Sequence, residues 1–249
     1  MIRRQLTAND STDYPGPMRR PLLLDLFCGA GGAAMGYFLA GFDVIGIDIN
    51  PQPEYPFKFM QADIMRAKIP WHKVQAVHAS PPCQVHSVTA SMNRMRPSKH
   101  KDLIEPTRTM LEATGLPTII ENVPGAPLLD PVMLCGSMFN LHTKYYELKR
   151  HRLFESNVGL TQPQDRCGSK RAVSVFEMHG SYRRSAVSVI GHGGLYRRRG
   201  VSARGESTPP RGLCIQLMGM PWVTRFAGLA QAIPPAYTAY LGRWMREYI

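Results

Sequence analysis

A cysteine behind two prolines is the residue of this chain best suited to covalent chemistry. Cys83 follows Pro81 and Pro82 at the end of a short apolar run, 74–79, which predicts a buried strand. Ligands of open α/β sheets bind where such strands end. A thiolate needs an electropositive, partly exposed setting, and the loop that follows supplies Arg94, Arg96, Lys99 and Lys101. This pattern favours a nucleophile over the alternative of a small core residue.

Charged residues on two further segments could assist that nucleophile. Glu121 follows an Ile-Ile pair and is expected at the same sheet edge as Cys83, where burial would raise its pKa and allow it to donate a proton. Arg150 and Arg152 alternate in a stretch of strand character that begins at Lys149, so they could hold an acid and a polar substrate edge. From spacing alone, a solvated strand-end acid and an exposed basic edge strand are equally acceptable interpretations.

A glycine-rich turn earlier in the chain predicts a cofactor site. The apolar run 21–27 is typical of a buried parallel strand, and 33–40 is typical of a helix ended by glycine. Between them the sequence reads Gly29-Ala30-Gly31-Gly32. Glycines at such a turn let the backbone approach a ligand, and the helix N-terminus favours an anion. A merely tight turn is the alternative.

Two acids lie downstream at positions where nucleoside contacts are expected. Asp48 ends the strand-like run 42–48, where an acid can bind both hydroxyls of a ribose. Asp63, with Ile64 beside it, could accept a hydrogen bond from the exocyclic amine of a base. The alternative for each acid is a loop cap.

The elements that must position these residues alternate along the chain. Strands at 117–123 and in the runs above alternate with helices such as 103–114, and 213–249 is again helical. Short strands are also possible at 173–175 and 186–190. This alternation predicts an α/β fold with a Rossmann-like, mostly parallel sheet flanked by helices.

Composition limits the partners and the compartment. The formal net charge of +12 and a pI of about 9.8 favour a polyanionic partner, most simply nucleic acid. Residues 156–211 hold ten Lys and Arg against three acids. No apolar run approaches the ~20 residues of a membrane span, and no apolar segment follows the charged N-terminus as in a signal peptide. The five cysteines are widely spaced without a C-x-x-C pair, which argues against disulfides and structural zinc and for a reducing cytosol.

In this order the motifs resemble those of the cytosine-C5 DNA methyltransferases. The resemblance covers about residues 21–155 and 211–249. Its six motif regions are Asp25 to Gly32, Asp48 with Asp63-Ile64, Pro82-Cys83-Gln84, Glu121-Asn122-Val123, Arg150-His151-Arg152 and Gln231-Ala232-Ile233-Pro234-Pro235. Three departures are a short variable region at 156–211, Gln231-Ala232 where Gly-Asn is commoner, and Asp48 where Glu is usual.

The resemblance implies S-adenosylmethionine as cofactor and a flipped-out cytosine as the reacting base. Cys83 would add to C6, Glu121 would act at N3, Arg152 would hold O2, Arg150 would support the site and Asn122 would hold neighbouring backbone. The implied cofactor contacts are Phe27, Gly29, Ala30, Gly31, Gly32, Asp48, Ile49, Asp63, Ile64, Pro81, Gln231 and Ala232. The expected nucleic-acid contacts are Gln84, Ser87, Arg94, Arg96, Lys99, Lys101, Arg183, Arg184, Arg197, Arg198 and Arg199.

The implied organisation has four parts: an N-terminal arm (1–20), a catalytic and cofactor-binding domain (21–155), a short basic target-recognition region (156–211) and a returning C-terminal segment (212–249). We expect a monomer that acts on duplex DNA, without a metal or a membrane, in the cytoplasm of a prokaryote or a phage-infected host. The alternatives are an RNA cytosine methyltransferase of the same fold, a nucleic-acid-binding protein that has lost catalysis, and transfer of a group larger than methyl.

Overall fold

The structure is a computed structural model, and it describes residues 20–82, 102–144, 146–163, 167, 185–187 and 210–249. Several sequence predictions lie outside these residues: the arm up to residue 19, the strand at 173–175 and the loop that begins at Cys83. Within the described part of the chain, no helix is both long and apolar enough to cross a bilayer.

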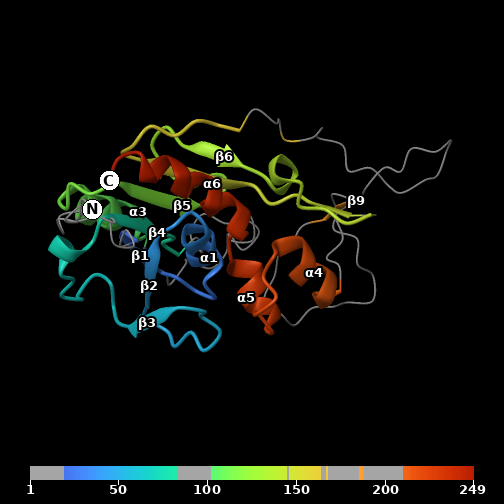
Figure 1. The fold of residues 1–249 in the computed structure, drawn as a ribbon, viewed down its shortest axis with the longest axis horizontal. Helices are drawn as coiled ribbons and strands as arrows, with labels where there is room; N and C mark the ends of the chain where they lie inside the picture. The colour runs from blue at the N-terminus through green and yellow to red at the C-terminus, as the bar shows by residue number, and fades with distance from the viewer. Residues whose placement is uncertain (1–19, 83–101, 145, 164–166, 168–184, 188–209) are drawn as a thin grey trace, which may run out of the picture.

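A seven-stranded sheet forms the centre of the fold (Figure 1), with strand order β3-β2-β1-β4-β5-β8-β6. The strands are β1 (Leu22–Leu26), β2 (Asp43–Asp48), β3 (Lys58–Gln61), β4 (Ala76–Ala79), β5 (Thr118–Asn122), β6 (Val132–Leu134) and β8 (Arg152–Ser156). β1 to β5 pair in parallel, and β8 runs antiparallel to β5 and β6. The predicted α/β architecture with a mostly parallel sheet is therefore confirmed.

Shorter elements surround this sheet. β7 (Tyr146–Leu148) pairs in parallel with β9 (Ser185–Val187), which overlaps the start of the strand predicted at 186–190. Two 3-10 turns are η1 (Trp71–Lys73) and η2 (Gly136–Phe139). The helices are α1 (Gly32–Leu39), α3 (Ile104–Glu112), α4 (Arg211–Met218), α5 (Phe226–Gln231) and α6 (Pro235–Arg246).

Alternate residues of each strand meet different helices, because successive side chains point to opposite faces of a sheet. On one face, Leu23 and Ile119 belong to a buried cluster with Tyr37 of α1 and Tyr237 of α6. On the other face, strand residues that include Leu24, Leu26, Val77 and Ile120 pack with Leu111 of α3. Helices thus cover both faces, as an all-parallel centre requires.

The C-terminal helix α6 returns to lie against α1. Thr238 Oγ1 donates a hydrogen bond to the Ala33 carbonyl at 2.8 Å. The approach is so close that a Cβ placed on Gly36 would lie 2.0 Å from Thr238 Oγ1. Pro235 occupies the first helical position, where its missing N–H leaves no bond unmade. Helix α6 is therefore part of the same core as β1.

Candidate active site

The loop between β1 and α1 has an unusual backbone. Phe27, Gly29 and Gly31 have φ angles of 57°, 48° and 79°, all in the left-handed region. Glycine adopts this region freely, but Phe27 does so at a cost of about 1–3 kcal/mol. Residues held in this region concentrate at functional sites, so the strain at Phe27 supports the prediction of a binding loop.

The glycines of this loop serve two different purposes. A Cβ on Gly31 would lie 2.5 Å from Pro56 Cδ, and one on Gly32 would lie 2.2 Å from the Ile233 carbonyl oxygen. At Gly29 a Cβ would meet nothing within 4 Å. The sequence left both ligand approach and a merely tight turn open for these glycines. Protein packing accounts for the lack of a side chain at Gly31 and Gly32, whereas Gly29 has open space beside it. Their contacts with a cofactor stay a prediction.

Asp48 stands where the sequence predicted it, at the end of β2 and beside the glycine-rich loop. Its Oδ2 accepts a hydrogen bond from the Gly29 amide at 3.1 Å, and its Oδ1 accepts one from the Asn50 amide at 2.9 Å. The side chain is largely buried, whereas Ile49 next to it is exposed. Asp48 therefore fixes the loop, and its contact with a ribose stays a prediction.

Asp63 caps its own loop, which the sequence offered as the alternative to a contact with a base. Its Oδ1 accepts a hydrogen bond from the Met65 amide at 3.0 Å, and Arg66 Nε lies 3.5 Å from its Oδ2. Ile64 is buried in the cluster on the α3 face of the sheet. The carboxylate thus caps its own turn, and its contact with a base edge stays a prediction.

The C-terminal segment reaches the glycine-rich loop through residues that sequence reasoning missed. Trp222 Nε1 donates to the carbonyl of Ala30 at 3.0 Å. Glu54 Oε1 accepts a hydrogen bond from the Thr224 amide at 2.7 Å. Burial acts to raise the pKa of Glu54, but the hydrogen bonds that its carboxylate accepts from the C-terminal segment hold this pKa below its usual range. No pattern in the sequence predicts this contact, since Trp222 lies between Pro221 and Val223 in an apolar stretch.

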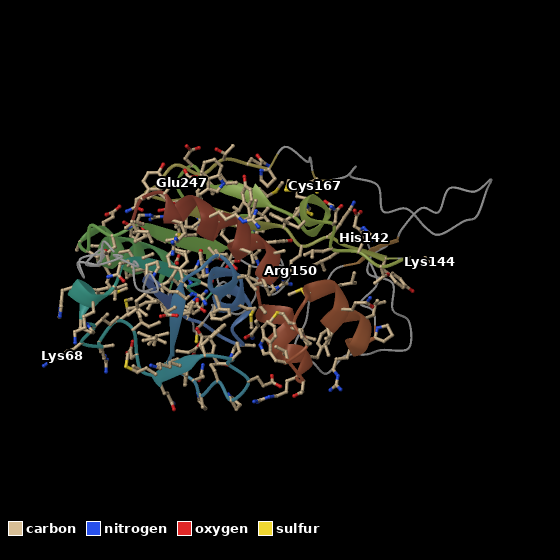
Figure 2. All side chains as sticks on the ribbon, viewed as in Figure 1. Lys68, His142, Lys144, Arg150, Cys167 and Glu247 are labelled. Carbon is tan, nitrogen blue, oxygen red and sulfur yellow. The ribbon has the colours of Figure 1, made fainter. Side chains whose placement is uncertain are left out.

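Arg150 anchors the end of α5 rather than alternating with Arg152 in a strand. Its Nε donates to the carbonyl of Ala232 at 3.0 Å, and its Nη2 donates to the carbonyl of Ala230 at 2.6 Å. β8 begins only at Arg152, three residues after the predicted start. The guanidinium meets the negative end of a short helix, and Arg150, labelled in Figure 2, is buried. Gln231, between the two carbonyls, is exposed.

Glu121 and Arg152 form a buried ion pair on the face of the sheet that α1 and α6 cover. Arg152 Nε lies 2.9 Å from Glu121 Oε1. Burial raises the pKa of Glu121 above its ordinary value, although Arg152, Ser80 and Arg150 act to lower it. A carboxyl of this kind can hold a proton and donate it to a base placed beside it.

A chain of hydrogen bonds leads from α1 to this carboxyl. Tyr37 Oη lies 3.0 Å from His78 Nδ1, and His78 Nε2 lies 2.9 Å from Ser80 Oγ. Ser80 in turn hydrogen-bonds to Glu121. Burial lowers the pKa of His78 to about 3, so its ring is neutral. If Ser80 donates to the carboxylate, His78 donates from Nε2 and accepts at Nδ1 from Tyr37. None of these three residues was predicted to act at the site.

Asn122 holds the backbone that leads to Cys83. Its Nδ2 donates to the carbonyl of Pro81 at 3.0 Å, and its Oδ1 accepts from the Val123 amide at 2.9 Å. Because β4 and β5 are adjacent and parallel, Pro81 and Glu121 meet at the same edge of the sheet. Asn122 is itself buried, so the residue two positions before Cys83 is firmly tied to β5.

The other predicted contacts lie outside the described residues. These are Cys83, Gln84, Ser87, Arg94, Arg96, Lys99, Lys101, Arg183, Arg184, Arg197, Arg198 and Arg199. The structure therefore describes the floor of the candidate site, at the ends of β1, β2, β4 and β5, and the two residues before the predicted nucleophile.

The fold is that of methyltransferases of known structure. A prophage-encoded protein of E. coli assigned as a DNA modification methyltransferase is 14% identical, with a TM-score of 0.56 over 91% of this chain and 99% of that one. The S. pombe Dnmt2 methyltransferase is 16% identical, with a TM-score of 0.54 over 92% and 99% of the two chains. The Entamoeba histolytica methyltransferase EhMeth is 10% identical, with a TM-score of 0.54 over the same shares. No protein-family model and no curated protein sequence matches the chain.

Proposed function

We propose that this protein transfers a methyl group from S-adenosylmethionine to C5 of a flipped-out cytosine in duplex DNA. The observation that carries the proposal is the buried pair of Glu121 and Arg152 beside the turn that leads to Cys83. A proton donor, a fixed guanidinium and a cysteine at one sheet edge are the groups that this reaction needs. The methyltransferase fold gives independent support.

The residues around Gly29 fit the cofactor. The N-terminus of α1 offers backbone N–H groups to a carboxylate, the side of Gly29 is open, and Asp48 can accept hydrogen bonds from ribose hydroxyls. S-adenosylmethionine supplies the electrophilic methyl group when it is bound there. Because Asp48 also holds the Gly29 amide, binding of the ribose and the shape of the loop depend on one side chain.

The protein's own groups would act on cytosine in a fixed order. The Cys83 thiolate adds to C6, and Glu121 protonates or hydrogen-bonds N3, so the electron pair of the C5–C6 double bond becomes available at C5. Arg152 holds O2 and the orientation of Glu121. After C5 has gained the methyl group, with S-adenosylhomocysteine as the other product, a water-mediated base removes the C5 proton, the C5–C6 double bond reforms and Cys83 leaves as a thiolate. The proton on N3 then returns to Glu121.

The proposed substrate is a nucleic acid because the formal net charge of the chain is +12 and much of that excess lies in 156–211. Among nucleic acids we propose DNA, because the order of the motifs resembles that of the DNA cytosine-C5 methyltransferases. We propose that the region 156–211 supplies the phosphate contacts and that the protein acts as a cytoplasmic monomer. RNA is the main alternative substrate. A protein distinguishes RNA from DNA by contacts with the 2′-hydroxyl. A binding protein without catalysis is less favoured, because such a protein has no need of a buried proton donor.

The test is nucleoside mass spectrometry after incubation with S-adenosylmethionine and mixed-sequence duplex DNA, with Cys83→Ser as the control variant. We expect 5-methylcytosine with the wild type and none with the variant. A covalent adduct with DNA that contains 5-fluorocytosine would identify Cys83 directly, because fluorine cannot leave from C5. If methylation appears only with RNA, the substrate assignment is wrong; if it appears with neither, the reaction itself is wrong.

A further inference from the structure

Two cysteines and a histidine that are distant in sequence meet beside the sheet. The sulfurs of Cys135 and Cys167 and a ring nitrogen of His151 all lie within 4.8 Å of one another. His151 Nε2 is 3.1 Å from Cys167 Sγ. Figure 2 shows Cys167 close to the end of β6. None of the three was assigned a role in methyl transfer, so the group stands apart from the proposed chemistry.

Strand register explains why Cys135 and His151 face one another. β6 and β8 are antiparallel, and Leu134 pairs with Arg152. The next pair in this register is Cys135 with His151, so their side chains lie across from each other where the ladder ends. Cys167 completes the group from the basic region 156–211. The sequence prediction of no structural zinc was based on the absence of closely spaced cysteines. The fold brings distant cysteines together.

The surroundings of Cys135 are suited to a thiolate ligand. The side chain is fully buried in the main core cluster, and Cys167 packs against the same cluster. Ser137 Oγ donates a hydrogen bond to Cys135 Sγ at 3.4 Å, and the Ser137 backbone also hydrogen-bonds to it. Donors of this kind orient metal-bound thiolates and are typical of the surroundings of metal sites.

We propose that Cys135, His151 and Cys167 bind a zinc ion. Tetrahedral coordination, with Zn–S distances of about 2.3 Å and Zn–N distances of about 2.0–2.1 Å, requires ligand atoms roughly 3.5–3.8 Å apart. The three ligand atoms lie within 4.8 Å of one another and His151 Nε2 lies 3.1 Å from Cys167 Sγ, so the observed distances are close to this range. Two thiolates and a neutral imidazole balance the charge of a divalent cation, which suits a buried site. A water or another ligand would take the fourth position.

The metal would join the basic region to the catalytic strand. Cys167 belongs to 156–211, whereas His151 lies between Arg150, which holds α5, and Arg152, which holds Glu121. A zinc ion at this position therefore fixes the start of the region expected to contact DNA against the side chains that form the site. The alternative for these two sulfurs is a disulfide between Cys135 and Cys167. A disulfide would not involve the nitrogen of His151, which lies 3.1 Å from Cys167 Sγ.

The experiment measures metal in the full-length protein, purified without chelators and after removal of any affinity tag. Plasma mass spectrometry is expected to find about one zinc per chain in the wild type and in Cys214→Ala, which removes a buried thiol outside the group. Cys167→Ser is expected to lose at least tenfold in zinc affinity in a competition with a chromogenic chelator. Cobalt replacement should give the intense visible bands and thiolate charge-transfer absorption of a tetrahedral site, which are observable even if Cys135→Ser fails to fold.

Three outcomes would overturn the proposal. In the first, the wild type binds no zinc or cobalt when its thiols are reduced. In the second, zinc is bound but Cys167→Ser and His151→Gln hold it with unchanged affinity, so other residues are the ligands. In the third, mass spectrometry of the alkylated protein finds Cys135 and Cys167 joined by a disulfide in freshly purified material. These readouts are independent of methyl transfer, so failure of the proposed function would leave them unaffected.

Discussion

Arg152 reaches from β8 to Glu121 of β5 and holds its carboxyl with an Nε–Oε1 distance of 2.9 Å. In the ladder Glu121 pairs with Phe154, and Arg152 is two residues from Phe154. Residues two apart in a strand share a face, so the pairing of β5 with β8 brings the carboxyl of Glu121 and the guanidinium of Arg152 together. Protonation of Glu121 at the floor of the site therefore depends on a residue of β8, the antiparallel strand of the seven-stranded sheet.

Glu121→Gln should abolish most of the methyl transfer without unfolding the protein. Glutamine keeps the shape and a hydrogen bond but cannot give a proton to N3, and loss of a general acid lowers the rate by roughly 10²–10⁴-fold. Initial rates of methyl incorporation at saturating cofactor measure this effect. Glu112→Gln, on the exposed side of α3, is the matched control and should keep the wild-type rate. A Glu121→Gln enzyme within tenfold of wild type would contradict the assigned role.

Ser80→Ala should move the pH dependence of the rate. Burial raises the pKa of Glu121, and the hydrogen bond from Ser80 partly offsets this. Removal of that bond raises the pKa further. Because Glu121 acts in its protonated form, the rate falls as the pH rises through this pKa, and in the variant the fall should occur at higher pH. A complete pH–rate profile measures the shift.

The control for this change is Ser156→Ala, because Ser156 makes its hydrogen bond to the Thr118 carbonyl. If Ser80 were only a structural residue, its replacement would lower the rate equally at every pH. An unshifted profile would therefore show that Ser80, and the Tyr37 and His78 side chains linked to it, do not affect the pKa of Glu121.

Asp25→Asn should change how stability depends on pH. Asp25 is fully buried, and burial raises its pKa well above the usual value. The native state therefore holds this proton more tightly than the unfolded chain does. The stabilising contribution is complete below the unfolded pKa of about 3.9, and it is lost as the pH rises through the folded pKa.

The midpoint of urea denaturation between about pH 4 and about pH 8 measures this effect. The wild type should lose more stability than Asp25→Asn as the pH increases, because asparagine does not ionise. Asp43→Asn, at the exposed start of β2, should follow the wild-type curve. Parallel curves for the wild type and Asp25→Asn would show that the buried carboxyl does not change its proton affinity on folding.

Asp48→Asn should weaken binding of S-adenosylmethionine by tenfold or more. The carboxylate accepts the Gly29 amide and can accept ribose hydroxyls, and hydrogen bonds to a charged group contribute about 1.5–3 kcal/mol each. Isothermal titration calorimetry measures the affinity, again with Asp43→Asn as the control. An unchanged affinity would mean that the ribose binds elsewhere.

The sequence predicted the central strands because each is a short apolar run with a glycine, proline or acid at its end or within three residues after it. It missed β3, since Lys58–Gln61 is a largely exposed edge strand without an apolar period. The positions of Asp48, Glu121 and Asn122 followed from strand ends that meet at one sheet edge. The Tyr37–His78–Ser80 chain could not be predicted, because it depends on how α1 lies over β4. The same holds for the Cys135, His151 and Cys167 group, which depends on the register of β6 against β8.

The packing of α6 on α1 is most directly tested by Gly36→Ala. The new Cβ would lie 2.0 Å from Thr238 Oγ1 and 2.2 Å from the Pro235 carbonyl oxygen, so backbone as well as side chain would have to move. Overpacking of this kind costs about 1–3 kcal/mol or more, and the denaturation midpoint should fall accordingly. Gly212→Ala is the matched control, since its Cβ meets nothing within 4 Å and alanine favours a helix by up to about 1 kcal/mol. Because α6 also joins the segment whose Trp222 holds Ala30, Gly36→Ala should lower cofactor affinity together with stability. Loss of stability with unchanged affinity would show that the glycine-rich loop keeps its shape without the C-terminal helix.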